Sequence, residues 1–395
     1  MTDTSITFGA IAAIEPPGGQ EPIPGIDAGL KARFDRANKD GELTRQIDFL
    51  GTEDDQGDEG TNLDVARSLV LRDNVFALSN TSQGANGSTE FLNQEHVPYL
   101  GWGFSPAYCG DVRYGVGFSG CLSNDVTEVS TGVTQILLDH LEEEGLAKSD
   151  VRFAMINEDY GGGRAGLSQV YSATVGQGVN VVYAESALPP EAQGAVSDYT
   201  PYVTAILATD PNVIFVSSGF SNTIGMTAAL KAAGFKGTIA NAIAYVPGLL
   251  EASPDIAAAL DGSYVVIVGF GAPEFGGEYW DQVQQDCEAS SDKCFVTLGF
   301  IVGYSTADFF IQTAQELERR EQNDGWEFNA ENFSAILANG FDVPGYGNVY
   351  GATAWPDDWT RNGLCDAMVL IKGTTYEGIT DLDCSFEYVP FELLN

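Results

Sequence analysis

The sequence predicts an α/β protein made of two doubly wound lobes, each a parallel sheet with helices on both faces. Apolar, strand-like runs alternate with helix-length amphipathic segments along the chain, a pattern typical of parallel sheets. The alternation starts again near residue 126, so the second part of the chain repeats the plan of the first. A length of 395 residues is enough for two domains, each with its own core.

The first lobe is predicted to begin at the amino terminus with a strand and to alternate regularly from there. Its expected strands are Ile6–Ile14, the stretch RQIDFLGTEDD at 45–55, Val75–Asn80 and Val97–Phe104. Helical segments are expected near Ile26–Asn38 and Asn62–Arg72, with a short one before Val97.

The second lobe is predicted to follow the same plan. Its expected strands are VRFAMIN at 151–157, VNVVYAES at 179–186, VIFVSSGF at 213–220 and TIANAIAYV at 238–246. Its expected helices lie near Val126–Glu144, Leu167–Val175, Tyr202–Ala208 and Thr223–Ala233. Ser263–Phe270 and a long helix around Leu298–Arg320 then predict a return to the first lobe. The Gly-, Pro- and Tyr-rich stretch Phe341–Trp355 has the composition of a loop that crosses between lobes.

The charge of the chain is strongly acidic. Eighteen basic and 56 acidic residues give a formal net charge of −38. Such a surface repels nucleic acid and anionic membranes, and it predicts a solvated acidic coat with no nucleic-acid partner. No apolar run reaches the roughly 18 residues that a membrane-spanning helix needs. The opening MTDTSITFGA lacks a basic leader segment, and we interpret Met1 as an expression start that replaces a removed leader.

The six cysteines occur as neighbours in the sequence. The expected disulfides are Cys109–Cys121, Cys287–Cys294 and Cys365–Cys384, chosen among about fifteen connectivities because short loops close most easily. Three local disulfides predict an oxidising, extracytoplasmic setting. The chain has no C-x-x-C, and its only histidines are His96 and His140, so a zinc site of the usual spacing is not expected.

A glycine motif follows the first strand of the second lobe. Gly161, Gly163 and Gly166 spell G-x-G-x-x-G, and Glu185 follows about 20 residues later, the spacing of a dinucleotide-binding turn. However, residues 158–160 separate the strand from the first glycine, and two of them are acids that would repel a pyrophosphate by roughly a few kcal/mol. We therefore expect no cofactor. The glycines instead let a helix begin close to the sheet, at the edge where open α/β sheets bind ligands.

The order of these parts resembles the type I periplasmic solute-binding proteins, in particular the branched-chain amino acid binding branch of ABC importers. The likeness runs from ITFGAIAAI to TAWPDDWTRNG. It includes the loop PPGGQEPIPG, TEDD at 52–55, VFALSNTSQ followed by VPYLGWGF, INEDYGGGRAG, IFVSSGF and, among the more specific motifs, AALKAAGFKG.

The resemblance implies two lobes joined by three hinge crossings, near Phe118–Asn124, Val266–Phe270 and Val343–Tyr350. Lobe 1 would comprise 1–120 plus 268–343 and lobe 2 would comprise 121–267 plus 344–395, with a ligand cleft between them. It also implies a monomer that performs no chemistry. Such a protein captures a small molecule by hinge closure outside the cytoplasm and delivers it to an ABC permease in the membrane.

The family's ligand-binding positions can be matched to residues of this chain. The matches at the ends of lobe-1 strands are Asn80, Thr81, Ser82, Gln83, Trp102, Gly103 and Phe104, and those in lobe 2 are Tyr160, Ser218 with its neighbours Ser217 and Gly219, Phe220 and Tyr245. Structural alternatives stay open at this stage. Thr81 and Ser82 could only cap a helix, Trp102 could be core, and Tyr160 could only cover its loop.

One position departs from the family pattern and bears on the ligand. Amino-acid binders of this branch place an acid where this chain has ANAIAYVPG (240–248), which offers Ile243 but no carboxylate. Either another acid, Glu15 or Asp159, reaches the ligand, or the ligand is not an α-amino acid. The large aromatic residues at the site, with Phe270 and Tyr304 as further candidates, predict a hydrophobic or aromatic ligand, with a carboxylate among the options. Arg113 and Arg164 are the basic residues expected nearest the cleft, as anion partners or as surface residues.

Two other classes of function remain open on the sequence alone. A serine hydrolase would need a histidine base and a G-x-S-x-G turn, and neither His96 nor His140 has that context. Paired carboxylates of a glycosidase could arise from the 56 acids by chance. A ligand-sensing receptor domain of the same fold would share all of the features above.

Overall fold

The computed structural model describes residues 4–14, 25–110, 113–123, 126–190, 196–291 and 294–394, and the chain divides into two compact units. Unit 1 comprises Met1–Val126 and Gly276–Gly363, and unit 2 comprises Thr127–Phe275 and Leu364–Asn395. The three boundaries lie later in the chain than the expected crossings. Residues 344–363 lie with unit 1 because Trp359 Nε1 donates to the carbonyl oxygen of Gly115 at 2.7 Å and Trp359 O accepts from the Gly110 amide.

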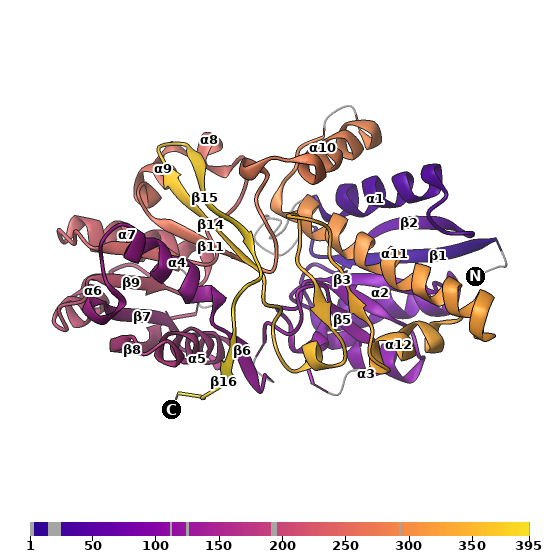
Figure 1. The fold of residues 1–395 in the computed structure, drawn as a ribbon, viewed down its shortest axis with the longest axis horizontal. Helices are drawn as coiled ribbons and strands as arrows, with labels where there is room; N and C mark the ends of the chain where they lie inside the picture. The colour runs from indigo at the N-terminus through magenta and orange to yellow at the C-terminus, as the bar shows by residue number, and fades with distance from the viewer. Residues whose placement is uncertain are drawn as a thin grey trace. The chain divides into compact units, whose positions relative to one another are not determined.

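Unit 1 contains a five-stranded sheet in which all neighbouring strands are parallel (Figure 1). Its order is β2 (Gln46–Asp54), β1 (Ser5–Ala12), β3 (Ala77–Thr81), β4 (Tyr99–Gly101) and β5 (Gly115–Gly117). The inner strand β1 is buried on both faces, with a bulge between Phe8 and Ala10. A sheet of this kind aligns the carboxyl ends of its strands along one edge.

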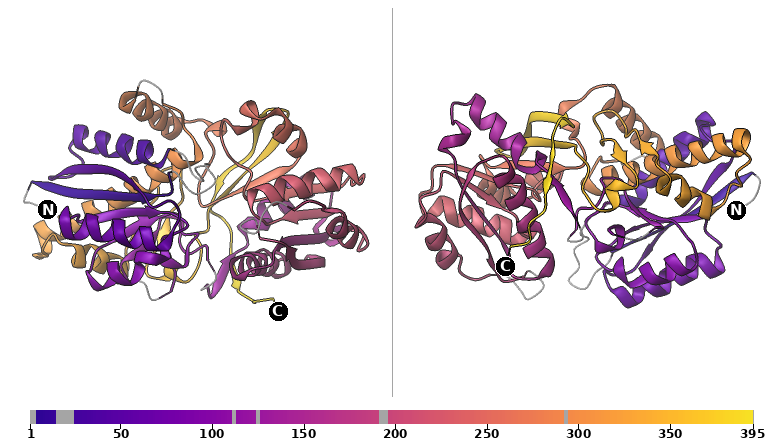
Figure 2. Two further views of the ribbon diagram at one scale, coloured as in Figure 1. Left: turned by 180° about the vertical axis from the view of Figure 1, so that it is seen from behind. Right: turned by 60° about the horizontal axis from the view of Figure 1, so that its bottom comes forward.

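Helices cover both faces of this sheet (Figures 1 and 2). The helices of unit 1 are α1 (Ile26–Asp40), α2 (Glu59–Arg67) continued by the π-helical turn η1 (Ser68–Arg72), α3 (Asn86–Gln94), α10 (Glu278–Ser290), α11 (Leu298–Asp324) and α12 (Ala330–Ala338), with short 3₁₀ turns at Pro106–Tyr108 and Asp357–Trp359. On one face, Phe8 meets Phe34 of α1 and Phe310 of α11, with ring centroids 4.9 Å away in both cases. On the other face, Ile11 and Leu78 belong to a cluster with residues of α2, η1 and α3.

A buried ionic network joins α1 to the late segments of unit 1. Arg33 Nε donates to Asp308 of α11 at 2.6 Å, and both nitrogens of its fork donate to Glu42. Arg36 reaches Asp286 of α10 at 3.0 Å and the hydroxyl of Tyr346 at 2.8 Å. The network therefore ties together segments that lie some 250 to 310 residues apart in the sequence.

Unit 2 contains a seven-stranded mixed sheet. Its order is β15 (Thr375–Asp383), β14 (Asp366–Lys372), β11 (Tyr264–Val268), β10 (Thr238–Asn241), β9 (Val213–Val216), β7 (Arg152–Glu158) and β8 (Asn180–Leu188). The five strands from β11 to β8 are parallel, and β14 and β15 form an antiparallel hairpin at the other end.

The inner strands β7, β9, β10 and β11 are buried on both faces, as parallel strands between two helical layers should be. The helices of unit 2 are α4 (Gly132–Glu143), α5 (Gly161–Gly176), α6 (Thr200–Leu207), α7 (Phe220–Ala232), α8 (Leu249–Ala252) and α9 (Pro254–Leu260), with 3₁₀ turns at Lys148–Asp150 and Pro273–Phe275. Phe153 and Met155 of β7 pack with residues of α4 and α5. Ala154 and Ile156 pack with residues of α6 and α7.

Several expectations from the sequence need correction. The segment near Val126–Glu144 is not one helix, because Glu128–Ser130 forms strand β6, paired with β16 (Tyr388–Pro390), before α4 begins. The helix expected from Leu167 begins at Gly161. Ser263–Phe270 does not return to the first lobe: it contains β11, an inner strand of the unit 2 sheet. The expected crossing loop contains the strand pair β12 (Asp342–Val343) and β13 (Thr353–Ala354).

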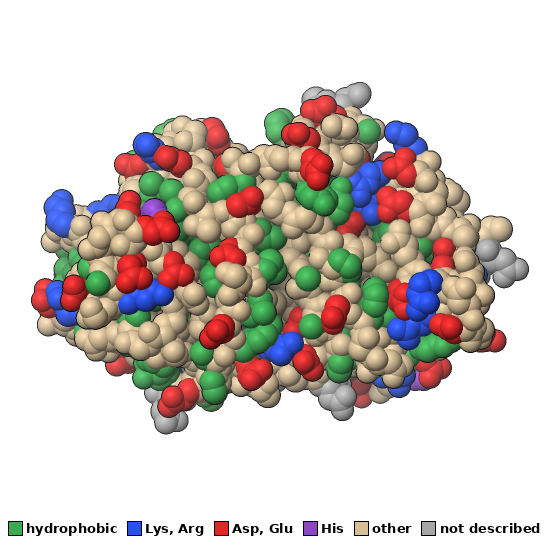
Figure 3. All heavy atoms as spheres, viewed as in Figure 1, with side chains coloured by type: hydrophobic (Ala, Val, Ile, Leu, Met, Phe, Trp, Pro, Cys, Tyr) green, Lys and Arg blue, Asp and Glu red, His purple; other side chains and the backbone are tan. Residues whose placement is uncertain are grey.

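The three expected disulfides are confirmed. Cys109–Cys121, Cys287–Cys294 and Cys365–Cys384 are bonded, with Cα atoms 5.1, 5.4 and 4.1 Å apart. Acidic side chains are spread over the face shown in Figure 3 and outnumber the basic ones there. Within the described ranges, no helix has both the length and the apolar character needed to span a membrane.

Candidate functional site

The carboxyl ends of β3 and β4 carry the predicted lobe-1 site residues. Thr81 ends β3 and Ser82 follows it, and both are buried, whereas Gln83 is exposed. Ser82 Oγ accepts a hydrogen bond from the Gly84 amide at 3.0 Å, in the turn before α3. The N-cap of α3 is Ala85, which makes no side-chain cap. Neither hydroxyl is therefore the N-cap of this helix, the alternative role that the sequence left open.

Asn80 differs from its neighbours because its side chain lies inside unit 1. It is fully buried, donates to Ser88 Oγ at 3.0 Å and exchanges hydrogen bonds with the side chain of Asn62. Asn62 also donates to the buried carboxylate of Asp55 at 2.7 Å. These contacts fix the end of β3 against α2 and α3.

Trp102, Gly103 and Phe104 follow β4 directly. The two aromatic rings lie edge to face, with centroids 5.7 Å apart and an interplanar angle of 76°, and both side chains are only partly buried. A Cβ atom added to Gly103 would overlap the carbonyl oxygen of Gly120, and the Gly103 carbonyl accepts from the Leu122 amide at 2.7 Å. Only glycine allows this close passage of two backbone segments, which positions the two rings.

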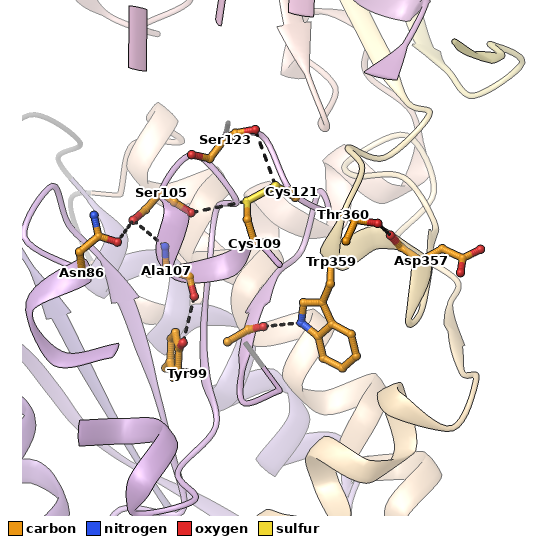
Figure 4. The surroundings of a disulfide bond; sticks show 11 residues. Asn86, Tyr99, Ser105, Ala107, Cys109, Cys121, Ser123, Asp357, Trp359 and Thr360 are labelled. Atoms are coloured by element: carbon orange, nitrogen blue, oxygen red, sulfur yellow. Dashed lines mark hydrogen bonds between the residues drawn. A yellow bond between two sulfur atoms is a disulfide. The ribbon is translucent and has the colours of Figure 1, made fainter. Parts of the chain in front are cut away.

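The Cys109–Cys121 disulfide holds the loop that follows these rings (Figure 4). Within that loop, Ser105 Oγ caps the amide of Ala107 at 3.2 Å and donates to Asn86 of α3 at 3.2 Å. The hydroxyl of Tyr99 donates to the Ala107 carbonyl at 2.9 Å. The loop is therefore fixed to α3 and β4 as well as by its own covalent bond.

In unit 2, Tyr160 lies between the end of β7 and the start of α5. It is the N-cap residue of α5, and its side chain is 49 % exposed. A Cβ atom added to Gly163 would overlap the carbonyl oxygen of Glu158, so the glycine motif allows the helix to begin against the strand end. That role for the glycines is the one predicted from the sequence.

The loop after the neighbouring strand β9 carries Ser217, Ser218 and Phe220. Ser217 lies beside β7, where its amide donates to the Ile156 carbonyl at 3.0 Å. Ser218 Oγ is within hydrogen-bonding distance of Thr223 Oγ1, at 3.2 Å. Phe220 is the first residue of α7 and is partly buried. The structure thus brings Tyr160 and Phe220 to the same edge of one sheet, on loops from adjacent strands.

Glu158 was missed by the sequence analysis as a residue of this edge. Its side chain is 4 % exposed, and Oε1 accepts from the Gly219 amide at 2.9 Å and from Asn222 Nδ2 at 2.8 Å. These contacts connect the end of β7 with the start of α7. The feature that marks Glu158 as a site residue is its burial at the end of a strand. The local sequence does not reveal this burial, because Glu158 stands among other polar residues.

Tyr245 is buried, with an exposed fraction of 3 %. Its hydroxyl donates to Glu274 at 2.6 Å, and its ring lies against Tyr376, with centroids 4.9 Å apart. Burial, assisted by the Glu274 carboxylate, raises the pKa of Tyr245 well above its usual range. An acid is therefore bonded to the 240–248 loop, although it comes from a later segment of the chain.

The remaining candidates take other positions. Phe270 and Tyr304 are fully buried, and Tyr304 belongs to the ionic network of unit 1. Arg113 precedes β5, and its neighbour Tyr114 stacks on His96, which precedes β4, so Arg113 lies at the amino-terminal edge of the sheet and not at the site edge. Ile243 is exposed, and Glu15 falls outside the described residues.

The exposed acid Asp159 pairs with Arg164 at 3.1 Å, at the start of α5. The two side chains help to line a cavity of about 210 Å³ in unit 2, together with Glu185 and Ser186. Among the described residues, no three His, Cys, Asp or Glu side chains are grouped to hold a metal ion.

Comparison with known proteins identifies the family. The model of the periplasmic binding protein family matches residues 5–368. The chain belongs to the periplasmic binding protein family. No curated protein sequence matches it.

Solved structures of periplasmic binding proteins share its fold at low identity. A fatty acid ABC transporter substrate-binding protein from Thermomonospora curvata has 15 % identity and a TM-score of 0.70, over 98 % of this chain and 94 % of that one. A solute-binding protein from R. palustris in complex with 4-hydroxybenzoate has 14 % identity and a TM-score of 0.65, over 98 % and 97 %. A branched-chain amino acid transporter protein from Thermus thermophilus with bound valine has 12 % identity and a TM-score of 0.68, over 98 % of both chains.

Proposed function

We propose that this protein is the extracytoplasmic solute-binding component of an ABC importer and that it delivers a small hydrophobic or aromatic molecule to a membrane permease. Membership of the periplasmic binding protein family supports the binding role. Structural relatives from ABC transporters support the transport role, and three disulfides suit an extracytoplasmic setting.

The proposed ligand contacts lie at the carboxyl edge of each sheet. In unit 1 they are the hydroxyls of Thr81 and Ser82 and the rings of Trp102 and Phe104, and in unit 2 they are Tyr160, Ser218 and Phe220. The observation that carries the ligand class is the edge-to-face pair of Trp102 and Phe104, partly exposed at the end of β4. Partly exposed rings in a ligand site contact apolar and planar molecules better than small polar ones.

Thermal unfolding with a ligand panel tests the proposal, because a ligand that binds only the folded state raises the melting temperature. The panel comprises leucine, valine, aromatic carboxylates, a steroid acid and NAD. We expect the aromatic compounds to raise the melting temperature. A shift with leucine or valine alone would favour the plain amino-acid binder, and a shift with NAD alone would contradict both.

Alanine variants then test the site. Phe104→Ala and Tyr160→Ala should each weaken binding of the best panel compound by about tenfold or more, because each removes a large aromatic contact. Phe295→Ala is the matched control, since Phe295 is 76 % exposed on the loop between α10 and α11. Unchanged affinity in both site variants would refute the assignment of these rings.

A ligand-sensing receptor domain is the second candidate, because the family fold serves both roles. The branched-chain amino acid binder is the third, favoured by the valine complex among the structural relatives. Stimulation of substrate uptake by a reconstituted permease distinguishes the transporter from the sensor.

A further inference from the structure

The start of α7 in unit 2 is occupied by a carboxylate of the protein itself. The amino-terminal amides of a helix are an attractive place for a negative group of a ligand. Here Glu158 Oε1 accepts one hydrogen bond from the backbone amide of Gly219, the N-cap residue of α7. It accepts a second from the side-chain amide of Asn222, in the first turn of the same helix. Asn222 Nδ2 also donates to the Pro189 carbonyl at 3.0 Å, and its Oδ1 accepts from the hydroxyl of Tyr199.

The start of α5 at the same edge is also acidic. Asp159 lies two residues before the helix and forms an ion pair with Arg164, at 3.1 Å. Residues 158–164 therefore carry two acids and one base.

The other basic residues of unit 2 do not offset this charge. All five lie at the opposite, amino-terminal edge of the sheet. Some lie at or just before the start of β7 or β10, and the others contact the segment that precedes β11: Lys148, Arg152, Lys231, Lys236 and Lys372. The carboxyl edge of unit 2 is therefore a negative environment, and the Gly219 amide at the start of α7 is already bonded to Glu158.

We infer that Glu158 determines the charge selectivity of unit 2: the carboxyl edge of this unit accepts a neutral or cationic group of the ligand and rejects a carboxylate. This inference rests on the proposed ligand-binding function. A ligand carboxylate is then bound by unit 1, where the hydroxyls of Thr81 and Ser82 lie before α3, a helix whose N-cap residue makes no side-chain cap.

A rescue experiment tests the role of Glu158 without knowledge of the ligand. Glu158→Ala leaves the Gly219 and Asn222 donors facing a cavity of the size of a carboxylate. We expect this variant to melt at a lower temperature than the wild type and to recover with sodium formate, in a saturable manner and beyond the effect of sodium chloride at equal ionic strength. The wild type and Asp159→Ala, which removes the exposed neighbouring acid, should show no such difference between the two salts.

Charge selectivity itself is tested with Glu158→Gln, whose amide oxygen can still accept both hydrogen bonds. The probes are terephthalate and 4-(aminomethyl)benzoate, which share one benzoate and differ in charge at the other end. The wild type should bind the amine at least tenfold more tightly, and Glu158→Gln should reduce that ratio by about tenfold. Equal wild-type affinity for both probes, or a ratio unchanged by Glu158→Gln, would overturn the inference.

The two experiments also separate failure of the inference from failure of the proposed function. If neither aromatic probe raises the melting temperature of the wild type, the proposed ligand class is wrong, and the formate rescue still decides the role of Glu158. Equal responses of Glu158→Ala to formate and chloride would show that these donors do not form an anion site, and the inference would be overturned.

Discussion

Asp366 offers a quantitative test of the buried charges in unit 2. The residue is fully buried at the start of β14, and within the described part of the chain neither of its carboxylate oxygens has a hydrogen-bond partner of good geometry. It lies against Gly132, the first residue of α4, because a Cβ atom added there would overlap Asp366 Oδ2. Burial raises the pKa of Asp366 to about 7, the Gly269 amide offsets this only in part, and the neighbouring Asp383 charge adds to it.

The sign of the pH dependence follows from the two pKa values. In the unfolded chain Asp366 loses its proton near 3.8, whereas in the folded protein it keeps the proton until about pH 7. Between these values the folded state binds more protons at Asp366, so the contribution of this residue to the free energy of unfolding falls as pH rises from about 4 to about 7 and is level above that. The difference of roughly 3 pKa units corresponds to about 4 kcal/mol, which is an upper bound for this group.

Asp366→Asn removes the charge but retains a buried polar group. We expect the variant to be about 1–3 kcal/mol more stable than the wild type at pH 8, because the neutral amide avoids the cost of a buried charge but still lacks partners. The gain should shrink towards zero at pH 4, where the wild-type carboxyl is protonated.

Denaturant unfolding at pH values from 4 to 9, with the disulfides intact, measures this effect. Asp381→Asn is the control, an exposed acid on the neighbouring strand β15. Its stability difference from the wild type should stay within about 0.5 kcal/mol at every pH. A difference for Asp366→Asn that does not change between pH 4 and 8 would refute the reasoning.

Two further predictions concern unit 1. Arg33→Met should destabilise the protein by about 3–5 kcal/mol in denaturant unfolding, because the buried Asp308 would lose its 2.6 Å ion pair and Glu42 would lose both hydrogen bonds from the same guanidinium group. Arg319→Met, which removes an exposed arginine, should cost much less. A similar cost for both variants would contradict this. Replacing Cys109 and Cys121 together by alanine should lower the free energy of unfolding by about 2–3 kcal/mol. This is the conformational entropy that the unfolded chain gains when a loop with a sequence separation of 12 is opened. A melting temperature equal to that of the wild type would exclude this contribution.

The regular βα alternation could be predicted from the sequence because strands and helices each show a characteristic spacing of apolar residues over a short stretch of chain. β1, β3, β7 and β9 were expected close to their observed positions, since each is a short apolar run between polar segments. The apolar pattern of Ser263–Phe270 fits either sheet, so its interpretation as a return to the first lobe was wrong, whereas the lobe bounds implied by the resemblance placed most of β11 in lobe 2. The hairpin of β14 and β15 was not expected, since β15 is largely exposed and its polar residues give no clear strand signal.

The candidate site shows the same division between local and long-range information. Tyr160 and Gly163 were interpretable because a strand end followed by glycines and a helix is a local pattern. Glu158 was not, because its partners Gly219 and Asn222 lie 61 and 64 residues away. The inward orientation of Tyr245 likewise depends on Glu274 and Tyr376, which come from later segments.

The discontinuous composition of unit 1 has a consequence for biosynthesis. Phe8 and Phe34 face Phe310, and Arg33 faces Asp308, so the first strand and helix to be made lack their partners until α11 has been synthesised. A ribosome must therefore add more than two hundred further residues after α1 before this core can close, and contacts of such long range form slowly. The core of unit 1 can therefore close only late in translation, whereas a core cluster of unit 2 between Ala154 and Ile239 needs no segment from α11.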